Sequence, residues 1–200
     1  MNKTGKITYF LCLVLLTALL CGCAASGIAS PDATGTGAYQ TDPVPDGKPQ
    51  PVEPQSAAVT DETITCTISI SCATVLDNLE LCDAEKVELV PEDGWLLPET
   101  QVAAVQGESV FDVLQRVCQE NRLHLEFSNT PVYNSAYIEG IGNLYEFDVG
   151  SLSGWMYSVN GWFPNYGCSR YQLQDGDVIE WRYTCDLGDD VGGSNTLDGE

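Results

Sequence analysis

The sequence predicts one α+β domain in which a single helix covers one face of a mixed β-sheet. Apolar and polar residues alternate from Thr63 to Cys72, which indicates a half-buried strand, and apolar residues recur at helical spacing from Val110 to Cys118. Further alternating stretches follow the helix as far as Thr184. Strands, one helix and strands again are typical of an α+β domain.

The N-terminal residues have the pattern of a secretory signal. Two lysines precede an apolar run from Ile7 to Leu20 that is too short and wrongly flanked for a stable membrane span. The run ends in Leu-Cys-Gly-Cys and resembles the lipobox of bacterial lipoproteins, in which the cysteine after a small residue receives a diacylglycerol before cleavage. The resemblance implies a signal peptide over residues 1–22 and a lipid-anchored Cys23 on the extracytoplasmic face of the bacterial cell membrane. An ordinary secretory signal cut near Ala24 is the alternative.

Residues 23–60 are expected to form a disordered linker between the anchor and the domain. They hold six prolines among Gly, Thr, Asp and Gln, with almost nothing large to bury. A flexible chain of that length places the domain on the order of 30 to 40 Å from the lipid. The globular domain is then expected over residues 61–187, a normal size for one core, and residues 188–200 are expected to form an acidic flexible tail.

The net charge limits the class of partner. With 8 basic and 29 acidic residues, the chain carries a formal charge of -21 and repels phosphate backbones and anionic headgroups. Nucleic acid is therefore excluded as a partner. Solubility in a crowded envelope is the simpler explanation of the acidity, and a specific electrostatic role is the alternative.

Before the helix, the sequence predicts one clear strand and two weaker extended segments. In the clear strand, Ile and Cys alternate with Thr and Ser over Thr63–Cys72. The weaker segments are Val87–Val90 and Gln101–Val105. Pro91 and Pro98 lie between them and mark a turn-rich connection.

Short-range sequence patterns also predict the helix and the strands after it. Ser109 can cap the helix together with Asp112 three residues on. Alternation then predicts strands at Leu123–Phe127, Ala136–Ile141, Gly154–Asn160 and Asp177–Thr184. In the last of these, the aromatic side of the strand is expected to face the core.

Four stretches resemble a known family when they are taken in order. They are Gly107–Leu114, Tyr137–Gly142, Gly154–Tyr157 and Leu173–Trp181. Together they are similar to the C-terminal domain of transcobalamin and intrinsic factor, and to a family of uncharacterised domains of bacterial surface lipoproteins. The resemblance runs from about Thr63 to Tyr183 and implies a β-grasp fold.

The resemblance also implies ligand binding. In the animal cobalamin carriers this small domain closes over one side of a corrinoid, while a large helical barrel holds the other side. The present chain has no barrel, so corrinoid binding requires another protein, or a second copy, to supply the missing wall.

An aromatic stretch from Gly154 to Tyr171 is the predicted ligand-binding region. Rings on a backbone shaped by Gly and Pro can stack on a planar ligand or anchor a partner, and Asn and Arg side chains add polar contacts. The candidate residues are Trp155, Tyr157, Asn160, Trp162, Phe163, Tyr166, Arg170 and Tyr171. Alternation with Val159 favours a core position for Trp155 and Tyr157. For the rings on the predicted loop, core and surface positions stay equally open.

The cysteines give one candidate disulfide. Cys66 and Cys72 lie on one face of a strand about 20 Å apart, which is too far for a bond. Cys118 on the apolar helix face is a plausible neighbour of either, or a buried free thiol. Cys168 and Cys185 flank the last strand and form the candidate pair.

Metal and catalytic sites are not expected. No Cys-x-x-Cys occurs in the sequence. The alternation places His124, the single histidine, on the solvent-exposed face of its strand, away from any nucleophile. Asp186, Asp189 and Asp190 lie beside glycines and could ligate calcium, but they lack the spacing of a known calcium loop, which favours a solvated tail. We therefore expect a protein that is not an enzyme and holds no resident cofactor.

Two functions remain in different classes. The first is a membrane-anchored module that captures a corrinoid or similar planar small molecule with a partner, such as a helical-barrel cobalamin-binding protein. The second is a cell-surface protein-protein interaction module that presents the same aromatic loop to an envelope protein.

Replacing Cys23 tests the anchor. Cys23→Ala is expected to leave an unprocessed or released protein, because the acyl acceptor is lost. Metabolic labelling with palmitate and partition into detergent measure this outcome. Continued partition of the variant, together with unlabelled wild-type protein, would show that Cys23 carries no lipid.

Overall fold

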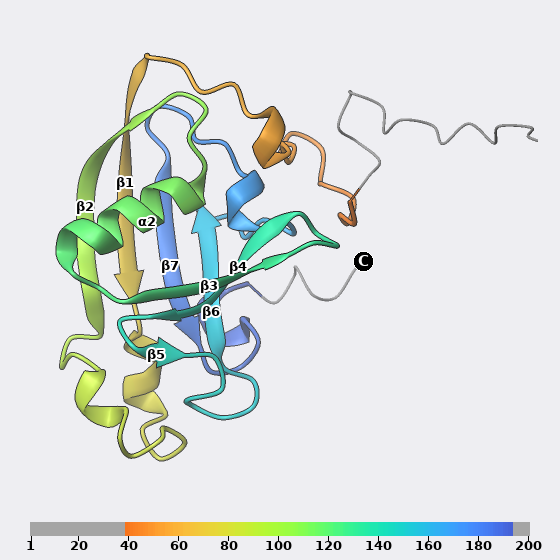
Figure 1. Cartoon of the computed structure of the whole chain (residues 1–200). Helices are drawn as coiled ribbons and strands as arrows, with labels where there is room; N and C mark the ends of the chain where they lie inside the picture. The colour runs from red at the N-terminus through yellow and green to blue at the C-terminus, as the bar shows by residue number, and fades with distance from the viewer. Residues whose placement is uncertain (1–38, 194–200) are drawn as a thin grey trace, which may run out of the picture. The chain divides into compact units, whose positions relative to one another are not determined.

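Four strands form the central sheet of the protein, seen here in a computed structural model that describes residues 39–193. The strands are β1 (Thr63–Ser71), β2 (Trp95–Val105), β6 (Gly154–Val159) and β7 (Val178–Thr184). Their order across the sheet is β2-β1-β7-β6 (Figure 1). The predicted signal peptide, Cys23 and residues 194–200 lie outside the described residues.

The central pair of strands is parallel, and the two outer strands are antiparallel to their neighbours. Ile68 of β1 pairs with Ile179 of β7, and Ile70 pairs with Trp181, so the first and last strands of the domain meet at its centre. These side chains are fully or almost fully buried. A parallel central pair with antiparallel edges and one long helix is the β-grasp-like α+β arrangement expected from the sequence, which is confirmed.

The helix α2 (Val110–Asn121) covers one face of this sheet (Figure 1). The predicted cap is present, because Ser109 Oγ accepts from the Asp112 amide at 3.2 Å and the Asp112 carboxylate accepts from the Ser109 amide at 2.8 Å. Arg122 ends the helix in the left-handed conformation, with φ of 57°. The buried face of the helix consists of Val110, Val113, Leu114, Val117 and Cys118.

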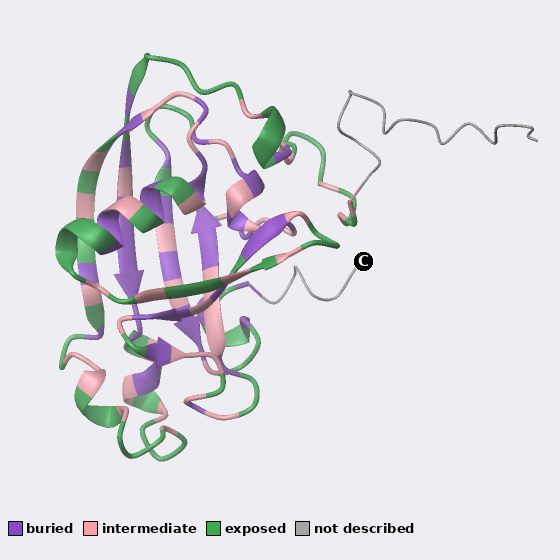
Figure 2. Ribbon diagram, viewed as in Figure 1, coloured by how far each residue is buried: buried purple, intermediate pink, exposed green. Residues whose placement is uncertain are grey.

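A second, smaller sheet contains the other strands. It consists of β3 (Leu125–Thr130), β4 (Ser135–Ile141) and β5 (Leu144–Tyr145) in the order β3-β4-β5. The sequence predicted a single mixed sheet, but β3 and β4 pair with each other as a hairpin. Ala136, Ile138 and Ile141 of β4 join the same hydrophobic core as the four-stranded sheet. Figure 2 shows buried segments in purple on strands of both sheets.

The strand β2 is longer than the sequence indicated. Pro98 was interpreted as part of a turn, yet it lies inside β2, where the pairing register with β1 shifts between Ile68 and Ile70. An edge strand tolerates a proline at such an irregularity, because the missing amide need not bond a neighbour. The predicted extended segment Val87–Val90 is wrong for Val87–Leu89, which form a 3-10 helix.

Short 3-10 helices connect the larger elements. They are η1 (Pro54–Ser56), η2 (Ala73–Asp77), η3 (Val87–Leu89), η4 (Cys168–Arg170) and η5 (Asp189–Val191). Within residues 39–193, no helix combines the length and the apolar character needed to cross a membrane.

The described ends of the chain differ from the flexible segments expected there. Residues 39–60 contact the domain through backbone hydrogen bonds such as Val52 N to Arg170 O at 2.9 Å. At the other end, Asp190 accepts a hydrogen bond from the Cys185 amide at 2.7 Å, and Val191 is buried. Hydrogen bonds hold both ends, and Val44 and Val191 add isolated apolar contacts, so neither end shows an apolar periodicity in the sequence.

A charged substitution tests whether the apolar face of α2 packs in the core. Val113→Asp buries an unpaired carboxylate at a fully buried site and is expected to lower the free energy of unfolding by several kcal/mol. Gln115→Asp is the matched control on the exposed face of the same helix, with an expected change within about 0.5 kcal/mol. Urea denaturation measures both. Equal stabilities of the two variants would show that this helix face is not part of the core.

Candidate binding site

Arg170 is the buried charge around which the candidate site is arranged. It ends η4, and its side chain is 4% exposed. One terminal nitrogen donates to Glu53 Oε1 at 2.7 Å, and the other donates to Thr41 Oγ1 at 2.6 Å and to the carbonyl of Tyr133 at 3.2 Å. Since Glu53 is equally buried, the two charges neutralise each other inside the protein.

A proline-rich segment, residues 39–56, lies against a cluster of three aromatic rings. The cluster consists of Trp162, Tyr166 and Tyr171, with ring centroids between 6.0 and 6.4 Å apart. Tyr166 donates its hydroxyl to the carbonyl of Pro49 at 2.7 Å, and Lys48 Nζ lies 5.2 Å from the ring centre of Trp162. The segment therefore covers part of the surface that the aromatic residues would otherwise expose.

A hollow of about 620 Å³, which we call the aromatic hollow, opens between this segment and the β3–β4 hairpin. Tyrosines line it from the β3–β4 hairpin and from the loop after β6, and Met156 and Pro164 add further apolar surface. The lining residues are Gln40, Thr41, Asp42, Thr130, Tyr133, Ser135, Ala136, Tyr137, Met156, Pro164, Asn165, Tyr166, Gly167 and Arg170. A cavity of this size can hold a small organic molecule, since such sites measure roughly 300 to 1,000 Å³.

Two unpaired buried atoms distinguish the aromatic hollow. Within residues 39–193, three buried side-chain atoms lack a hydrogen-bond partner, and two of them, Arg170 Nε and Asn165 Oδ1, belong to residues that line this hollow. Buried polar groups in native proteins are almost always bonded, because an unpaired one costs about 1–3 kcal/mol. One of the two atoms is a donor, the other is an acceptor, and both are buried.

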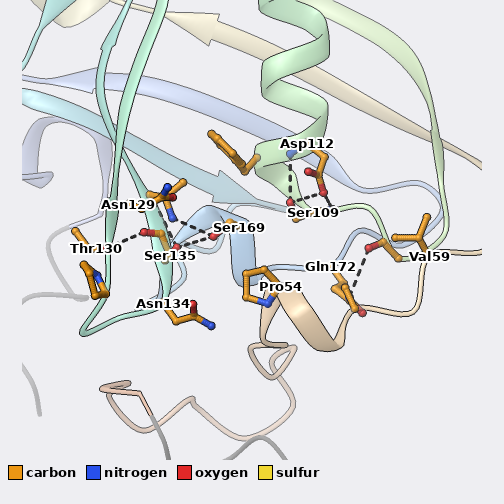
Figure 3. Close-up of a pocket in the computed structure, with 15 residues that line it drawn as sticks. Pro54, Val59, Ser109, Asp112, Asn129, Thr130, Asn134, Ser135, Ser169 and Gln172 are labelled. Atoms are coloured by element: carbon orange, nitrogen blue, oxygen red, sulfur yellow. Dashed lines mark hydrogen bonds between the residues drawn. The ribbon is translucent and has the colours of Figure 1, made fainter.

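A second hollow of about 470 Å³, which we call the polar hollow, is lined by Pro54, by the start of α2 and by the β3–β4 hairpin (Figure 3). It shares Thr130, Ser135 and Ala136 with the aromatic hollow. Its polar side chains are mostly engaged with one another or with the backbone. Figure 3 shows Ser135 bonded to Ser169, at 2.9 Å, and Ser109 bonded to Asp112, at 2.7 Å. The aromatic hollow is therefore the better candidate for a ligand.

Of the residues predicted to bind a ligand, only Tyr166 and Arg170 line the aromatic hollow. The other predicted residues lie outside the hollow, where they make structural contacts. Tyr157 is buried on β6 and donates to the carbonyl of Tyr166 at 2.7 Å, and Trp155 Nε1 donates to the carbonyl of Leu144 at 2.8 Å. Tyr157 therefore takes the core position that alternation favoured, whereas Trp155 is only partly buried and packs against the core.

The remaining predicted residues have structural contacts. Asn160 is exposed and braces the end of β7, because its amide side chain bonds Asp177 at 2.8 Å and the Val178 amide at 2.9 Å. Trp162 and Tyr171 belong to the aromatic cluster, and Phe163 is buried beside Gly193. The aromatic richness of this stretch therefore serves packing as well as the hollow.

The sequence interpretation missed the contribution of the β3–β4 hairpin. Tyr133 and Tyr137 line the aromatic hollow and remain 48% and 46% exposed. Their signal was available, since Val132 and Tyr133 are apolar residues at the predicted turn between two strands. Burial and the hydrogen bond to Glu146 raise the pKa of Tyr137 to about 12, so its hydroxyl stays protonated at neutral pH.

Burial also keeps the aromatic cluster neutral. Desolvation raises the pKa of Tyr171 to about 12 and raises that of Tyr166 further. Both hydroxyls are therefore hydrogen-bond donors at neutral pH. They present an uncharged surface in a strongly acidic protein.

The candidate disulfide between Cys168 and Cys185 does not form in this structure. Both residues are free thiols, as are the other four cysteines between Cys66 and Cys185. Cys168 belongs to the main core, whereas Cys185 packs against a second cluster that contains Cys72. Burial raises the pKa of Cys168 to about 12 and that of Cys185 to about 11, so neither is a reactive thiolate at neutral pH.

No metal centre is found within residues 39–193, where no group of three or more His, Cys, Asp or Glu side chains is arranged to hold an ion. The carboxylate of Asp190, a candidate calcium ligand, instead accepts hydrogen bonds from Thr184 and from the Cys185 amide. His124 is exposed, as its parity predicted.

Comparison with known proteins gives one family match and two partial structural likenesses. A family described as a domain of unknown function (DUF4430) matches residues 107–185, from the start of α2 to the end of β7. Haptocorrin in complex with Cbi aligns with a TM-score of 0.47 at 15% identity, over 64% of this chain and 26% of haptocorrin. A "putative metal binding protein" from Ruminococcus gnavus aligns with a TM-score of 0.37 at 15% identity, over 60% of this chain and 96% of that protein.

These likenesses carry no functional argument, because both TM-scores lie below 0.5. The chain spans about a quarter of the length of haptocorrin. No curated protein sequence matches the chain.

The buried ion pair is tested by removing one partner. Glu53→Ala leaves the Arg170 guanidinium buried without its carboxylate and is expected to lower the free energy of unfolding by about 3–5 kcal/mol. Arg182→Gln breaks the more exposed pair with Glu180, and its expected cost is at most about 1 kcal/mol. Urea denaturation measures both costs. A cost below 1 kcal/mol for Glu53→Ala would mean that residues 39–56 do not stay on the domain in solution.

Proposed function

We propose that the chain is a non-enzymatic binding module, lipid-anchored at Cys23 on the extracytoplasmic face of the bacterial membrane, that takes a small molecule in the aromatic hollow. The observation that carries this proposal is that two residues lining the hollow, Arg170 and Asn165, each keep a buried side-chain atom without a partner, Nε and Oδ1. An amide group has the complementary chemistry, since a carbonyl accepts from an N–H such as Nε–H and an amide N–H donates to an oxygen such as Oδ1.

The lining of the hollow favours a flat ligand. Tyr133, Tyr137 and Tyr166 provide ring surfaces on which a planar molecule can stack. A planar molecule with amide groups is therefore the ligand class that best matches both the rings and the unpaired atoms. A corrinoid such as cobinamide belongs to this class, because its ring carries amide side chains at the edge.

A corrinoid would require a partner. Tyr133 and Tyr137 stay half exposed, so the hollow covers one side of such a ligand and leaves the other side to solvent. We propose that another envelope protein, for example a helical-barrel cobalamin-binding protein, covers that side.

The alternative function is protein-protein interaction without a small-molecule ligand. It is favoured by the apolar tip of the β3–β4 hairpin, where Val132 is 60% exposed beside Tyr133 and Tyr137. Contiguous exposed apolar residues at a hairpin tip are a common form of protein contact.

A substitution at the rim of the aromatic hollow tests the ligand. Tyr137→Ala is expected to keep stability within about 1 kcal/mol, because the ring is half exposed, and to weaken cobinamide binding by about 2 kcal/mol, roughly thirtyfold. Phe147→Ala, which removes a 61% exposed ring outside the hollow, is the matched control and is expected to bind as wild type does. Calorimetric titration of residues 24–200 with cobinamide and cobalamin measures both.

The protein sample for this test must begin before Tyr39. A fragment limited to residues 61–187 would lack Glu53 and leave Arg170 unpaired in the core. If wild type binds neither corrinoid, the small-molecule proposal fails. An envelope protein that is captured by wild type and lost with Tyr137→Ala would then favour the alternative.

A further inference from the structure

Residues 39–56 contact the domain through backbone hydrogen bonds as well as through side chains, among them Val44, which packs against the core. Tyr166 donates to the carbonyl of Pro49 at 2.7 Å, and Asn165 donates to the carbonyl of Pro43 at 2.8 Å. In the opposite direction, the Val52 amide donates to the carbonyl of Arg170 at 2.9 Å. Because backbone groups are common to all sequences, these bonds select an extended chain and not a particular set of side chains.

Prolines hold the segment in the extended form that these contacts need. Five prolines lie between Pro43 and Pro54, and each fixes its own φ near −65° and restricts the residue before it to extended conformations. Glu53, which precedes Pro54, has φ of -65° and ψ of 131°, close to the polyproline II values. A single turn at residues 46–48 separates two extended parts, and there the Lys48 amide bonds the carbonyl of Pro45 at 3.1 Å.

One side chain of the segment supplies the charge that pairs with Arg170. Glu53 is the only described residue between 39 and 60 that is classed as buried, and it forms the 2.7 Å ion pair with Arg170. Asn134 of the hairpin also donates to the Glu53 carboxylate. The contact therefore has two parts. Tyr166 and Asn165 donate hydrogen bonds to the proline-rich backbone, and Arg170 binds one carboxylate.

We propose that the face made by Trp162, Asn165, Tyr166 and Arg170 is a recognition groove for proline-rich, extended segments that carry a carboxylate. In this structure residues 39–56 of the same chain occupy the groove. The partner that the groove fits in trans is a proline-rich acidic segment of another protein, which must displace the intramolecular one. Aromatic grooves suit such segments because a proline-rich chain loses little conformational entropy on binding.

The test uses the chain from residue 24 to 200 with a protease site placed among the exposed residues 58–61, cleaved after folding. The probe is a fluorescent peptide of residues 39–57. We expect saturable binding of the peptide to the cleaved protein once its own segment has been exchanged. Uncleaved protein should bind at least about tenfold more weakly, because its tethered segment competes at high effective concentration.

Two substitutions separate recognition from general adhesion. A Glu53→Gln peptide should bind at least about tenfold more weakly, since it loses the buried ion pair. Tyr166→Phe in the protein keeps the ring and removes the hydroxyl donor to Pro49. This variant should bind the wild-type peptide about three- to tenfold more weakly. A peptide with the exposed Gln50 changed to Ala is the matched control and should bind as wild type does.

Three results would overturn the proposal. The first is loss of the cleaved segment on gel filtration with no rebinding of the peptide. The second is equal binding of the wild-type and Glu53→Gln peptides. The third is unfolding of the protein when the segment leaves, detected by circular dichroism, because residues 39–56 would then be part of the core and not the occupant of a groove. None of these readouts involves a corrinoid, so this proposal and the proposed function fail separately.

Discussion

The need to pair one buried guanidinium organises the candidate site. Arg170 is almost inaccessible to water, so each of its donors must find an acceptor within the protein or in a ligand. Its terminal nitrogens bond the N-terminal segment through Glu53 and Thr41, and the hairpin tip through the carbonyl of Tyr133. Three parts of the chain that are distant in sequence are thereby joined at one charge, and the aromatic hollow lies where they meet.

The elements that the sequence predicted well are those with local causes. The alternation in β1 and β7 reflects strands with a buried face, and the Ser109–Asp112 cap needs only residues three positions apart. The strand β2 was cut short in the prediction because Pro98 is a turn signal everywhere except at an edge, and the sequence does not show which strand is the edge.

The candidate site was harder to predict, because its contacts join distant positions. Composition marked residues 39–60 as a tether, and no apolar periodicity contradicted this, since the segment is held by scattered groups that include proline carbonyls, the Thr41 hydroxyl and the Glu53 carboxylate. Glu53 and Arg170 are 117 positions apart. The sequence left core and surface positions open for Trp162 and Tyr166, because it could not show that part of the same chain covers these rings.

Docking of the N-terminal segment also sets how far the domain can reach from the membrane. Under the proposed anchoring at Cys23, 16 residue steps separate the lipid from Tyr39, a covalent limit of roughly 55 Å. If the segment left its groove, the first backbone bond to the domain would be that of Thr60 to Gln106, 37 steps from the anchor, and the limit would rise to roughly 125 Å. Occupation of the groove by another protein would therefore more than double the height above the bilayer at which the domain can work.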